Sequence, residues 1–277
     1  MRHGRSLVPA PVITPAQSRA AVRDLADALH HWRVWLALAF NDIKARYRRS
    51  KLGQFWLTIS MAVTIGALAV VYSALFRLEI ATYIPLIATG FIAWSLIATL
   101  ITDGAGVFIE AESYLRNAPL AKSTFVFRVI IRNLVVFAHN LVLVPLVMLL
   151  FGIVPTPATL LFVPALLLTL VNGVWLAAVL GTICARYRDL PPIVASVVQI
   201  AFFVSPVMWT RDLLSAEKQF IVTLNPFAAF LEVLREPLLG RVPSLSAWLV
   251  VLAITLVGML GGFVFFARFR ARIAYYM

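Results

Sequence analysis

The sequence has one cysteine and few charged side chains, and it lacks the motifs of several common protein classes. Charged residues make up 13% of its 277 residues, whereas soluble domains contain about a quarter. The lone Cys184 excludes an internal disulfide. Because no G-x-x-x-x-G-K-[ST] motif occurs, the chain does not bind ATP phosphates by the P-loop mechanism. No group of His, Cys and acidic residues has the spacing of a metal site.

Acidic residues are also missing from the middle of the apolar segments. Proton-relay and sodium-coupled transporters use such groups, so both classes are disfavoured. A membrane-embedded glycan-modifying enzyme is a remote alternative, because no pair of carboxylates stands beside a plausible catalytic partner. We expect the polar residues of these segments to form hydrogen bonds between helices rather than bind a ligand; they are His139, Asn140, Asn172 and Gln199.

The sequence does have a series of long apolar segments, and hydrophobic residues make up 62% of the chain. A helix must cover roughly 30 Å to cross the hydrocarbon core of a bilayer. The predicted fold is all-α: a polytopic membrane protein with six transmembrane helices, an N-terminal amphipathic interface helix and short re-entrant external helices. The six expected spans are about 55–76, 83–102, 129–151, 160–185, 193–209 and 247–266.

The distribution of charge predicts the orientation of the chain. The net charge is +12, and most Lys and Arg residues precede the first span or follow the second, fourth and sixth. The opposite side holds only Arg77, Arg211, Lys218, Arg235 and Arg241. By the positive-inside rule, both termini are cytoplasmic. This rule accounts for the basic composition, so nucleic acid is not an expected partner.

The chain divides into three regions. Residues 1–22 have no apolar core of a secretory signal, and we expect a disordered cytoplasmic tail there. Residues 23–48 carry apolar side chains at helical spacing and predict an amphipathic interface helix on the inner leaflet. This helix either anchors the chain to the membrane or also packs against a cytoplasmic partner. Residues 49–277 form the six-helix transmembrane domain.

Two connections between spans carry amphipathic patterns. In the 103–124 loop, apolar residues share one helical face, and Glu112 and Arg116 have the i,i+4 spacing of an ion pair. This helix either simply connects the two spans or protrudes and transmits force from a soluble subunit. The external stretch 224–240 has one apolar face and is too short to cross the membrane. It either caps a pathway or floats at the outer interface.

Two further groups of residues have alternative interpretations. Arg128 and Arg132 lie one helical turn apart near the start of the third span, where we expect them to anchor to lipid phosphates. The alternative is that they line the path of an anionic headgroup. Aromatic residues near the ends of the spans form either an interfacial belt or stacking surfaces for sugar rings.

Five sequence features, in this order, resemble the permease subunit of ABC-2 type polysaccharide exporters, which move O-antigen, capsular polysaccharide or teichoic acid precursors. The resemblance extends from about residue 24 to the end of the chain. The features are D-I-K-x-R-Y-x-x-S-x-L-G-x-x-W at 42–56, ARYRDL at 185–190, SPVMW at 205–209, LNPFAAFLEVLREPLLG at 224–240 and FRARIAYYM at 269–277.

The resemblance implies a multi-pass protein of the cytoplasmic (inner) membrane that works as a homodimer with two copies of a separate ABC ATP-binding subunit. That subunit would bind ATP and magnesium, whereas this chain would hold no cofactor and would not be an enzyme. Its other partners would be membrane lipids and a lipid-linked polysaccharide. The 24–44 helix would rest on the ATP-binding subunit. The residues that couple to it would be Phe108, Glu112, Tyr114, Leu115, Arg116, Arg186 and Asp189.

The resemblance also implies a route for the polymer. A lipid-linked diphosphate would meet Arg46 and Arg49 at the inner leaflet. An external gate region at about 211–245 would include Asn225, Pro226, Phe230 and Arg235. The polymer would pass along Phe55, Tyr72, Phe76, Phe202, Phe203 and Trp209. An ABC-2 permease that exports a drug or lipid is the main alternative, and a scaffold without transport is another.

Overall fold

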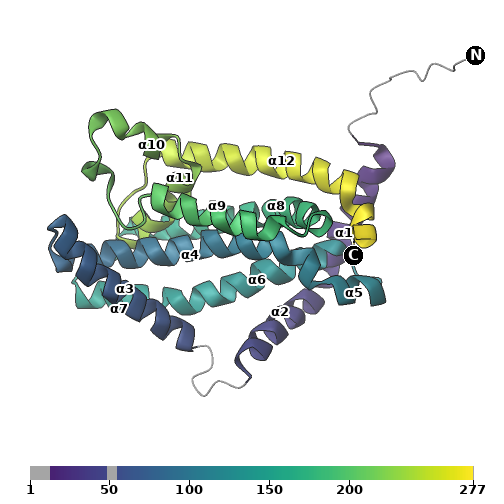
Figure 1. The fold of residues 1–277 in the computed structure, drawn as a ribbon, viewed down its shortest axis with the longest axis horizontal. Helices are drawn as coiled ribbons and strands as arrows, with labels where there is room; N and C mark the ends of the chain where they lie inside the picture. Colours follow the sequence, from purple (N-terminus) through teal and green to yellow (C-terminus); the bar gives the residue numbers. More distant parts are fainter. Residues whose placement is uncertain (1–12, 49–54, 277) are drawn as a thin grey trace, which may run out of the picture.

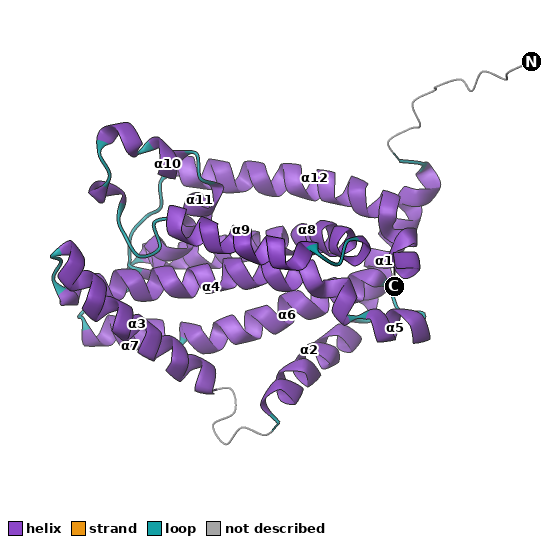
Figure 2. Cartoon of the chain, in the orientation of Figure 1, coloured by secondary structure: helices purple, strands orange, loops and turns teal. Residues whose placement is uncertain are grey.

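The computed structural model describes residues 13–48 and 55–276, and every regular element in these two ranges is a helix (Figure 2). The longer helices are α1 (Pro15–His30), α2 (Trp32–Tyr47), α3 (Phe55–Phe76), α4 (Ile80–Glu110), α6 (Lys122–Leu141), α8 (Phe162–Arg186), α9 (Leu190–Val204), α11 (Pro226–Leu238) and α12 (Leu245–Tyr276). The shorter ones are α5 (Glu112–Asn117), α7 (Leu143–Leu150), η1 (Pro157–Leu161), η2 (Arg211–Leu213), η3 (Ala216–Lys218) and α10 (Phe220–Thr223).

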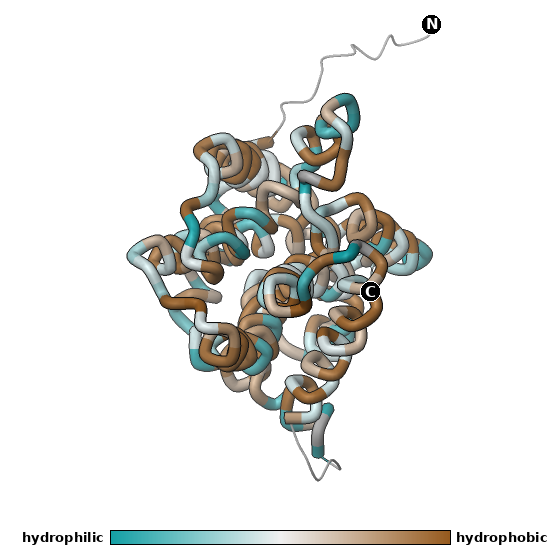
Figure 3. Tube along the Cα trace, turned by 90° about the vertical axis from the view of Figure 1, so that its left-hand side faces the viewer, coloured by the Kyte–Doolittle hydropathy of each residue, from teal (hydrophilic) through white to brown (hydrophobic). Residues whose placement is uncertain are grey.

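Helices α4, α6, α8, α9 and α12 run along the long axis of the molecule as one bundle (Figure 1). Helices α1 and α5 and the end of α12 lie at one end of this bundle, here termed the α5 end. Helix α10 and its connections lie at the opposite end, here termed the α10 end. Viewed from the α10 end, hydrophobic residues dominate the helices (Figure 3), as expected for a bundle that has lipid as its solvent.

Helix α4 is the centre of the bundle, because it contacts α3, α6, α8, α9 and α11. It approaches α8 most closely where Gly104 lies against Ala177 and Gly181 lies against Val107. Small residues let the backbones of membrane helices pack closely in this way. The large side chains of α4 that are almost completely buried are Tyr83, Ile87, Ile92, Leu96, Leu100 and Phe108.

The structure confirms an all-α multi-pass membrane fold but changes two of the expected spans. The expected 193–209 span is wrong at its end, because α9 stops at Val204 after 15 residues, or about 22 Å. The expected 129–151 span is divided into α6 and α7 at Val142. Within the described residues, five segments are long and apolar enough to cross a membrane: Phe55–Leu75, Ile80–Asn117, Lys122–Leu150, Pro157–Arg186 and Leu245–Tyr276.

The N-terminal region also differs from the expectation. Part of the expected 1–22 tail is helical, because α1 begins at Pro15, where the Thr14 side chain and Gln17 form a capping box. Residues 1–12 lie outside the described part of the chain. The single helix expected at 23–48 is two helices, because the chain breaks at His31 before α2 begins. The expected start at residue 23 was therefore wrong, whereas α2 ends at Tyr47, one residue from the expected end.

Candidate coupling surface and substrate path

An exposed surface at the α5 end consists of α5 and the turn between α8 and α9, and we term it the coupling surface. The Glu112 carboxylate joins the two segments. It accepts from Arg116 one helical turn away at 2.8 Å, which confirms the predicted i,i+4 pair, and from Arg188 in the turn at 3.0 Å. Two segments that are separated in the sequence thus form one charged surface.

Most of the residues expected to couple to a partner lie at this surface. Tyr114, Arg116, Arg186 and Asp189 are exposed, and Glu112 and Leu115 are half-buried. Phe108 is the exception, because it belongs to α4 and is completely buried. Its assignment as a coupling contact was therefore wrong. The helical pattern of 103–124 did not reveal that α4 continues to Glu110 and buries this ring before α5 begins.

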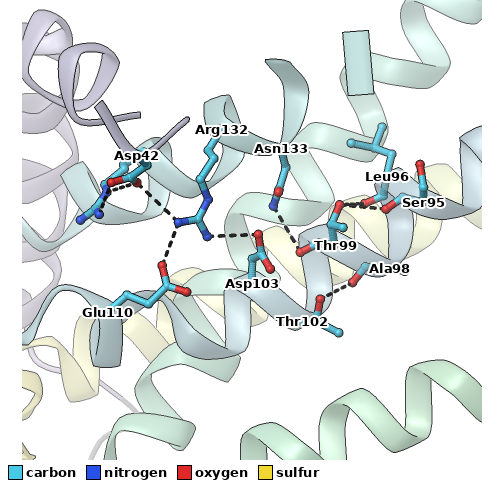
Figure 4. A network of polar contacts seen from close by, with 11 residues as sticks. Asp42, Ser95, Leu96, Ala98, Thr99, Thr102, Asp103, Glu110, Arg132 and Asn133 are labelled. Atoms are coloured by element: carbon cyan, nitrogen blue, oxygen red, sulfur yellow. Dashed lines mark hydrogen bonds and ion pairs between the residues drawn. The ribbon is translucent and has the colours of Figure 1, made fainter. Parts of the chain in front are cut away.

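A network of ion pairs with two buried arginines and partly exposed carboxylates lies between α2, α4 and α6 (Figure 4). Arg128 of α6 donates to both carboxylate oxygens of Asp42 in α2, each at 2.6 Å. Arg132, one turn further along α6, donates to Glu110 at 2.8 Å and to Asp103 at 3.1 Å, and it lies 3.5 Å from Asp42. The network therefore connects α2, α4 and α6 through two arginine side chains.

This network corrects the expected role of its two arginines. Arg128 and Arg132 retain 8% and 5% of their exposure, so neither extends to lipid phosphates. A buried charge is tolerated only when it is paired and hydrogen-bonded, and three carboxylates provide those pairs. The sequence analysis missed Asp42, Asp103 and Glu110 as partners. Arg128 and Asp42 are 86 residues apart, and helical periodicity carries no information over that distance.

A second anchor at the α5 end also escaped the sequence analysis. Asp24 of α1 is 3% exposed. Its carboxylate accepts from the backbone N–H groups of Lys122 and Ser123, at 3.1 and 2.9 Å, and from Arg270 of α12 at 2.7 Å. It therefore satisfies N–H groups at the start of α6, which have no partner within their own helix. Asp24 thus joins α1, α6 and α12.

Aromatic rings expected along the polymer path fall into different environments. Phe202 packs edge-on against Phe91 and Phe203, with ring centroids 5.8 and 5.3 Å apart, and it also contacts Trp94. Phe203 itself is exposed, as is Phe55 at the start of α3. Rings of α4 and α9 thus contact one another in a row that begins at the buried Trp94 and ends at the exposed Phe203.

The other residues expected along the substrate path are more scattered. Tyr72 is half-buried on α3, and Phe76 is the last residue of that helix. Trp209 lies beyond the end of α9, where its indole N–H donates to the carbonyl of Phe203 at 3.4 Å. Arg46 is exposed near the end of α2. Arg49 lies outside the described residues.

The expected external gate region contains α11, which packs inside the bundle against α4, α8 and α12. Asn225 caps this helix, since its side chain accepts from the Phe227 N–H at 2.9 Å and donates to Ser205 at 2.9 Å. Pro226 occupies the first turn, where its missing N–H has no cost. Phe230 is buried. The alternative that this helix floats at the interface is therefore excluded.

Arg235 connects α11 to the segment that follows α9. It is 8% exposed and donates to the carbonyl of Pro206 at 2.7 Å and to Glu236 at 3.1 Å. The same segment meets α4, because the Tyr83 hydroxyl donates to the carbonyl of Met208 at 2.5 Å. Two polar side chains thus hold the connection between α9 and α11 in place.

The polar residues within the spans have separate environments. The Asn172 amide donates to Thr255 of α12 at 2.6 Å, and its oxygen accepts from the Trp175 indole at 2.9 Å, which confirms the expected interhelical bond there. His139 bonds to the carbonyl of Val135 within its own helix. Gln199 is exposed on α9. In the described part of the chain, no three His, Cys or acidic residues are arranged to hold a metal ion.

The chain is similar to several curated proteins. It is 24% identical over 210 residues to the O-antigen export system permease protein RfbA of Myxococcus xanthus, covering 75% of this chain and 81% of that protein. Two proteins of the same name from Klebsiella pneumoniae are 19% and 23% identical over 192 and 203 residues. These matches cover 69% and 71% of this chain, and 74% and 76% of the relatives.

A family model for ABC-2 type transporters matches residues 33–239. The match begins in α2 and ends just after α11, so it includes the ion network, α5, the α8–α9 turn and α11. The family match and the bundle of long apolar helices agree with the resemblance seen in the sequence. The chain therefore belongs to the ABC-2 type transporter family of membrane proteins.

Proposed function

We propose that this chain is the permease subunit of an ATP-driven exporter that moves a lipid-linked polysaccharide, such as O-antigen or capsule, across the cytoplasmic membrane. The permease works as a homodimer with two copies of an ABC ATP-binding subunit, which binds and hydrolyses ATP with magnesium. The α5 end and both termini face the cytoplasm. Family membership and the names of the three curated relatives support the transport role and the polysaccharide.

The observation that carries the coupling role is the Glu112 bridge between α5 and the α8–α9 turn. A partner that pushes on α5 also pushes on α8 and α9 through this bridge. Behind it, Glu110 at the end of α4 pairs with Arg132, which reaches α2 through Asp42. Motion of the coupling surface therefore reaches α4, α6 and the interface helix together.

The exposed faces of α3 and α9 support the proposed homodimer. Val63 and Val70 on α3, and Val197 and Ile200 on α9, are each more than half exposed. Both helices contact α4, α3 also contacts α6, and α9 also contacts α8. The face that carries these four residues is left uncovered by this chain. Two copies that face each other with these helices would enclose a path lined by exposed rings such as Phe203. Weak contacts with many rings suit a polymer, because a tight site would stop its movement.

The proposed transport step begins when the lipid diphosphate meets basic residues near Arg46 at the inner leaflet. ATP binding closes the two partner subunits, and the coupling surface transmits this closure to α4, α8 and α9. The path opens and the polymer advances toward the α10 end. There, α11 and the segment held by Arg235 act as the external gate.

Deletion of the gene, followed by staining of the cell surface and membrane fractions for polysaccharide, tests the substrate. We expect surface glycan to disappear and lipid-linked polymer to accumulate inside the cell. Normal surface glycan would overturn the proposal and favour an ABC-2 permease for a drug or lipid. Loss of glycan that is independent of the ATP-binding subunit would favour a glycan-modifying enzyme.

The coupling role is tested with the double variant Glu112→Arg and Leu115→Asp. It removes the bridge to Arg188 and places charge on the half-buried side of α5. We expect loss of both glycan export and copurification of the ATP-binding subunit. Glu217→Arg, which makes the same Glu-to-Arg charge reversal at an exposed site of the α10 end, serves as the control. Survival of export and association in the double variant would show that α5 is not the coupling helix.

A further inference from the structure

A water-accessible cavity of about 600 Å³ opens at the α5 end, between α1, the connection from α5 to α6 and the end of α12. We term it the α1 cavity. Its lining contains none of the residues of the coupling surface, the ion network or the aromatic rings described above. Cationic side chains outnumber acidic ones in its lining: Arg19, Arg23, Lys122 and Arg270 against Asp24 and Asp27.

The acidic residues do not neutralise this positive charge. Both Asp24 oxygens already accept hydrogen bonds from backbone N–H groups, the Ser123 hydroxyl and Arg270. The charges of Asp24 and Arg270 therefore cancel each other. Among the described residues, no ion pair is formed by Arg19, Arg23 or Lys122. Three cations therefore share the cavity with the single carboxylate of Asp27, which attracts an anion.

Helix α1 presents two arginines on one face, with small residues beside them that leave room for a bound anion. Arg19 and Arg23 lie one turn apart, so their guanidinium groups lie on the same helical face. Ala16 and Ala20 line the cavity beside them and leave its centre open. Arginine presents a planar set of donors that matches the oxygens of a phosphate. Lys122 supplies a third cation from the beginning of α6.

The cavity lies beside the ends of two membrane-crossing segments, and this position indicates which kind of anion it meets. Its wall includes Arg270 near the end of α12, a helix long and apolar enough to cross a membrane. The beginning of α6, which continues into another such segment, forms a second wall. The cavity is therefore at the depth where phospholipid headgroups lie. Basic pockets between membrane helices at this depth bind acidic headgroups.

We infer that the α1 cavity binds the phosphate of an anionic phospholipid headgroup and that the bound lipid holds α1 against α6 and α12. The lipid adds a second link between helices that Asp24 already joins. Helix α1 begins upstream of the matched family segment, so the family match does not assign this site. The inference does not depend on which substrate is exported.

The test measures the thermal unfolding midpoint of the full chain, copurified with its ATP-binding subunit in detergent, against added dioctanoyl phosphatidylglycerol. We expect the midpoint to rise with lipid concentration. In Arg19→Gln with Arg23→Gln, the same rise requires roughly 30-fold more lipid, since each of the two basic residues near a membrane surface contributes about 1 kcal/mol to anionic lipid binding. Dioctanoyl phosphatidylcholine produces no rise.

A matched control is Arg211→Gln with Lys218→Gln, which removes two exposed cations at the α10 end, far from the cavity. It keeps the response of the parent protein. An equal response in the cavity variant, or no response in the parent, overturns the inference. An equal rise with glycerol 3-phosphate reassigns the occupant to a soluble phosphate. If the cavity variant keeps its lipid response but loses the ATP-binding subunit, the cavity is a protein contact instead.

Discussion

Helices α3 and α4 are both apolar and long enough to cross a membrane, but they have opposite surroundings. In the most apolar stretch of α4, 67% of residues are buried inside the protein, against 11% in α3. Only a narrow stripe of α3 is covered, with Ile65, Ala69 and Ser73 at its centre. Apolar composition therefore identifies a membrane helix but does not show whether its neighbours are protein or lipid.

The difference arises from small residues and polar partners rather than from hydrophobicity. In α4, Gly90 and Gly104 lie against backbone or side chains of other segments, whereas nothing lies within 4 Å of the position of a Cβ on Gly66 in α3. Helix α4 also carries Asp103 and Glu110, which pair with Arg132 of α6. Because lipid already solvates apolar side chains, close packing and polar bonds decide which helix is central.

The largest test of this comparison is Arg132→Met, which leaves Asp103 and Glu110 without their partner beside α4. Removal of one member of a fully buried ion pair costs about 3–5 kcal/mol. Because the Asp103 and Glu110 side chains are 27% and 44% exposed, we expect a loss at the lower end of this range. We expect the thermal unfolding midpoint of the purified protein to fall sharply, and little folded protein to be recovered. Arg33→Met, at an exposed cation of α2, is the control and changes little.

A triple variant separates charge from packing in that experiment. Asp103→Asn and Glu110→Gln, added to Arg132→Met, remove the uncompensated carboxylates. We expect most of the lost stability to return, because a buried ion pair replaced as a unit is close to neutral. A triple variant as unstable as the single one would show that the arginine acts through its packing.

The next effect comes from glycine. In Gly181→Leu, the Cβ of the new side chain overlaps Val107 of α4 and lies 3.0 Å from the carbonyl oxygen of Gly104. The rest of the leucine side chain has no open space here. Overpacking of this kind costs about 1–3 kcal/mol, which the unfolding midpoint reports. Gly66→Leu on α3 adds the same side chain to open space and leaves the midpoint unchanged. Equal losses in both variants would contradict the assignment of α3 as an uncovered helix.

A smaller effect is expected from Tyr83→Phe, which removes the hydroxyl that binds the Met208 carbonyl across the α10 end. Loss of one buried hydrogen bond costs about 1 kcal/mol, and the segment after α9 should become more accessible to protease. Thr64→Val on α3 removes a hydroxyl bonded only within its own helix, to Ser60. No change in protease sensitivity is expected there. Similar digestion of Tyr83→Phe and the parent would refute the role of the bond.

The smallest effect on stability belongs to Val63→Ala with Val70→Ala on the exposed face of α3. We expect a change within about 0.5 kcal/mol, as for surface sites in general. The fraction of crosslinked homodimer should nevertheless fall, because these side chains face the proposed second copy. An unchanged dimer fraction together with unchanged stability would mean that this face of α3 meets lipid.

Local features of the sequence predicted much of the fold and part of the site. Most of the spans, the Glu112–Arg116 pair and the amphipathic helix within 224–240 follow from patterns within a few residues, because helix formation is local. The buried position of Phe108 and the early end of α9 were missed. Both depend on what packs against the helix or follows it, which a periodic pattern does not contain.

The sequence by itself determined that the chain crosses a membrane as helices, because transfer of apolar side chains into lipid is a sum over neighbouring residues. It also determined the family, through short motifs in a set order. Only the tertiary structure decided that α4 is buried and α3 is not, and that Arg132 pairs with Asp103 across 29 residues. Those outcomes depend on contacts between distant segments, and such contacts exist only once the helices have packed.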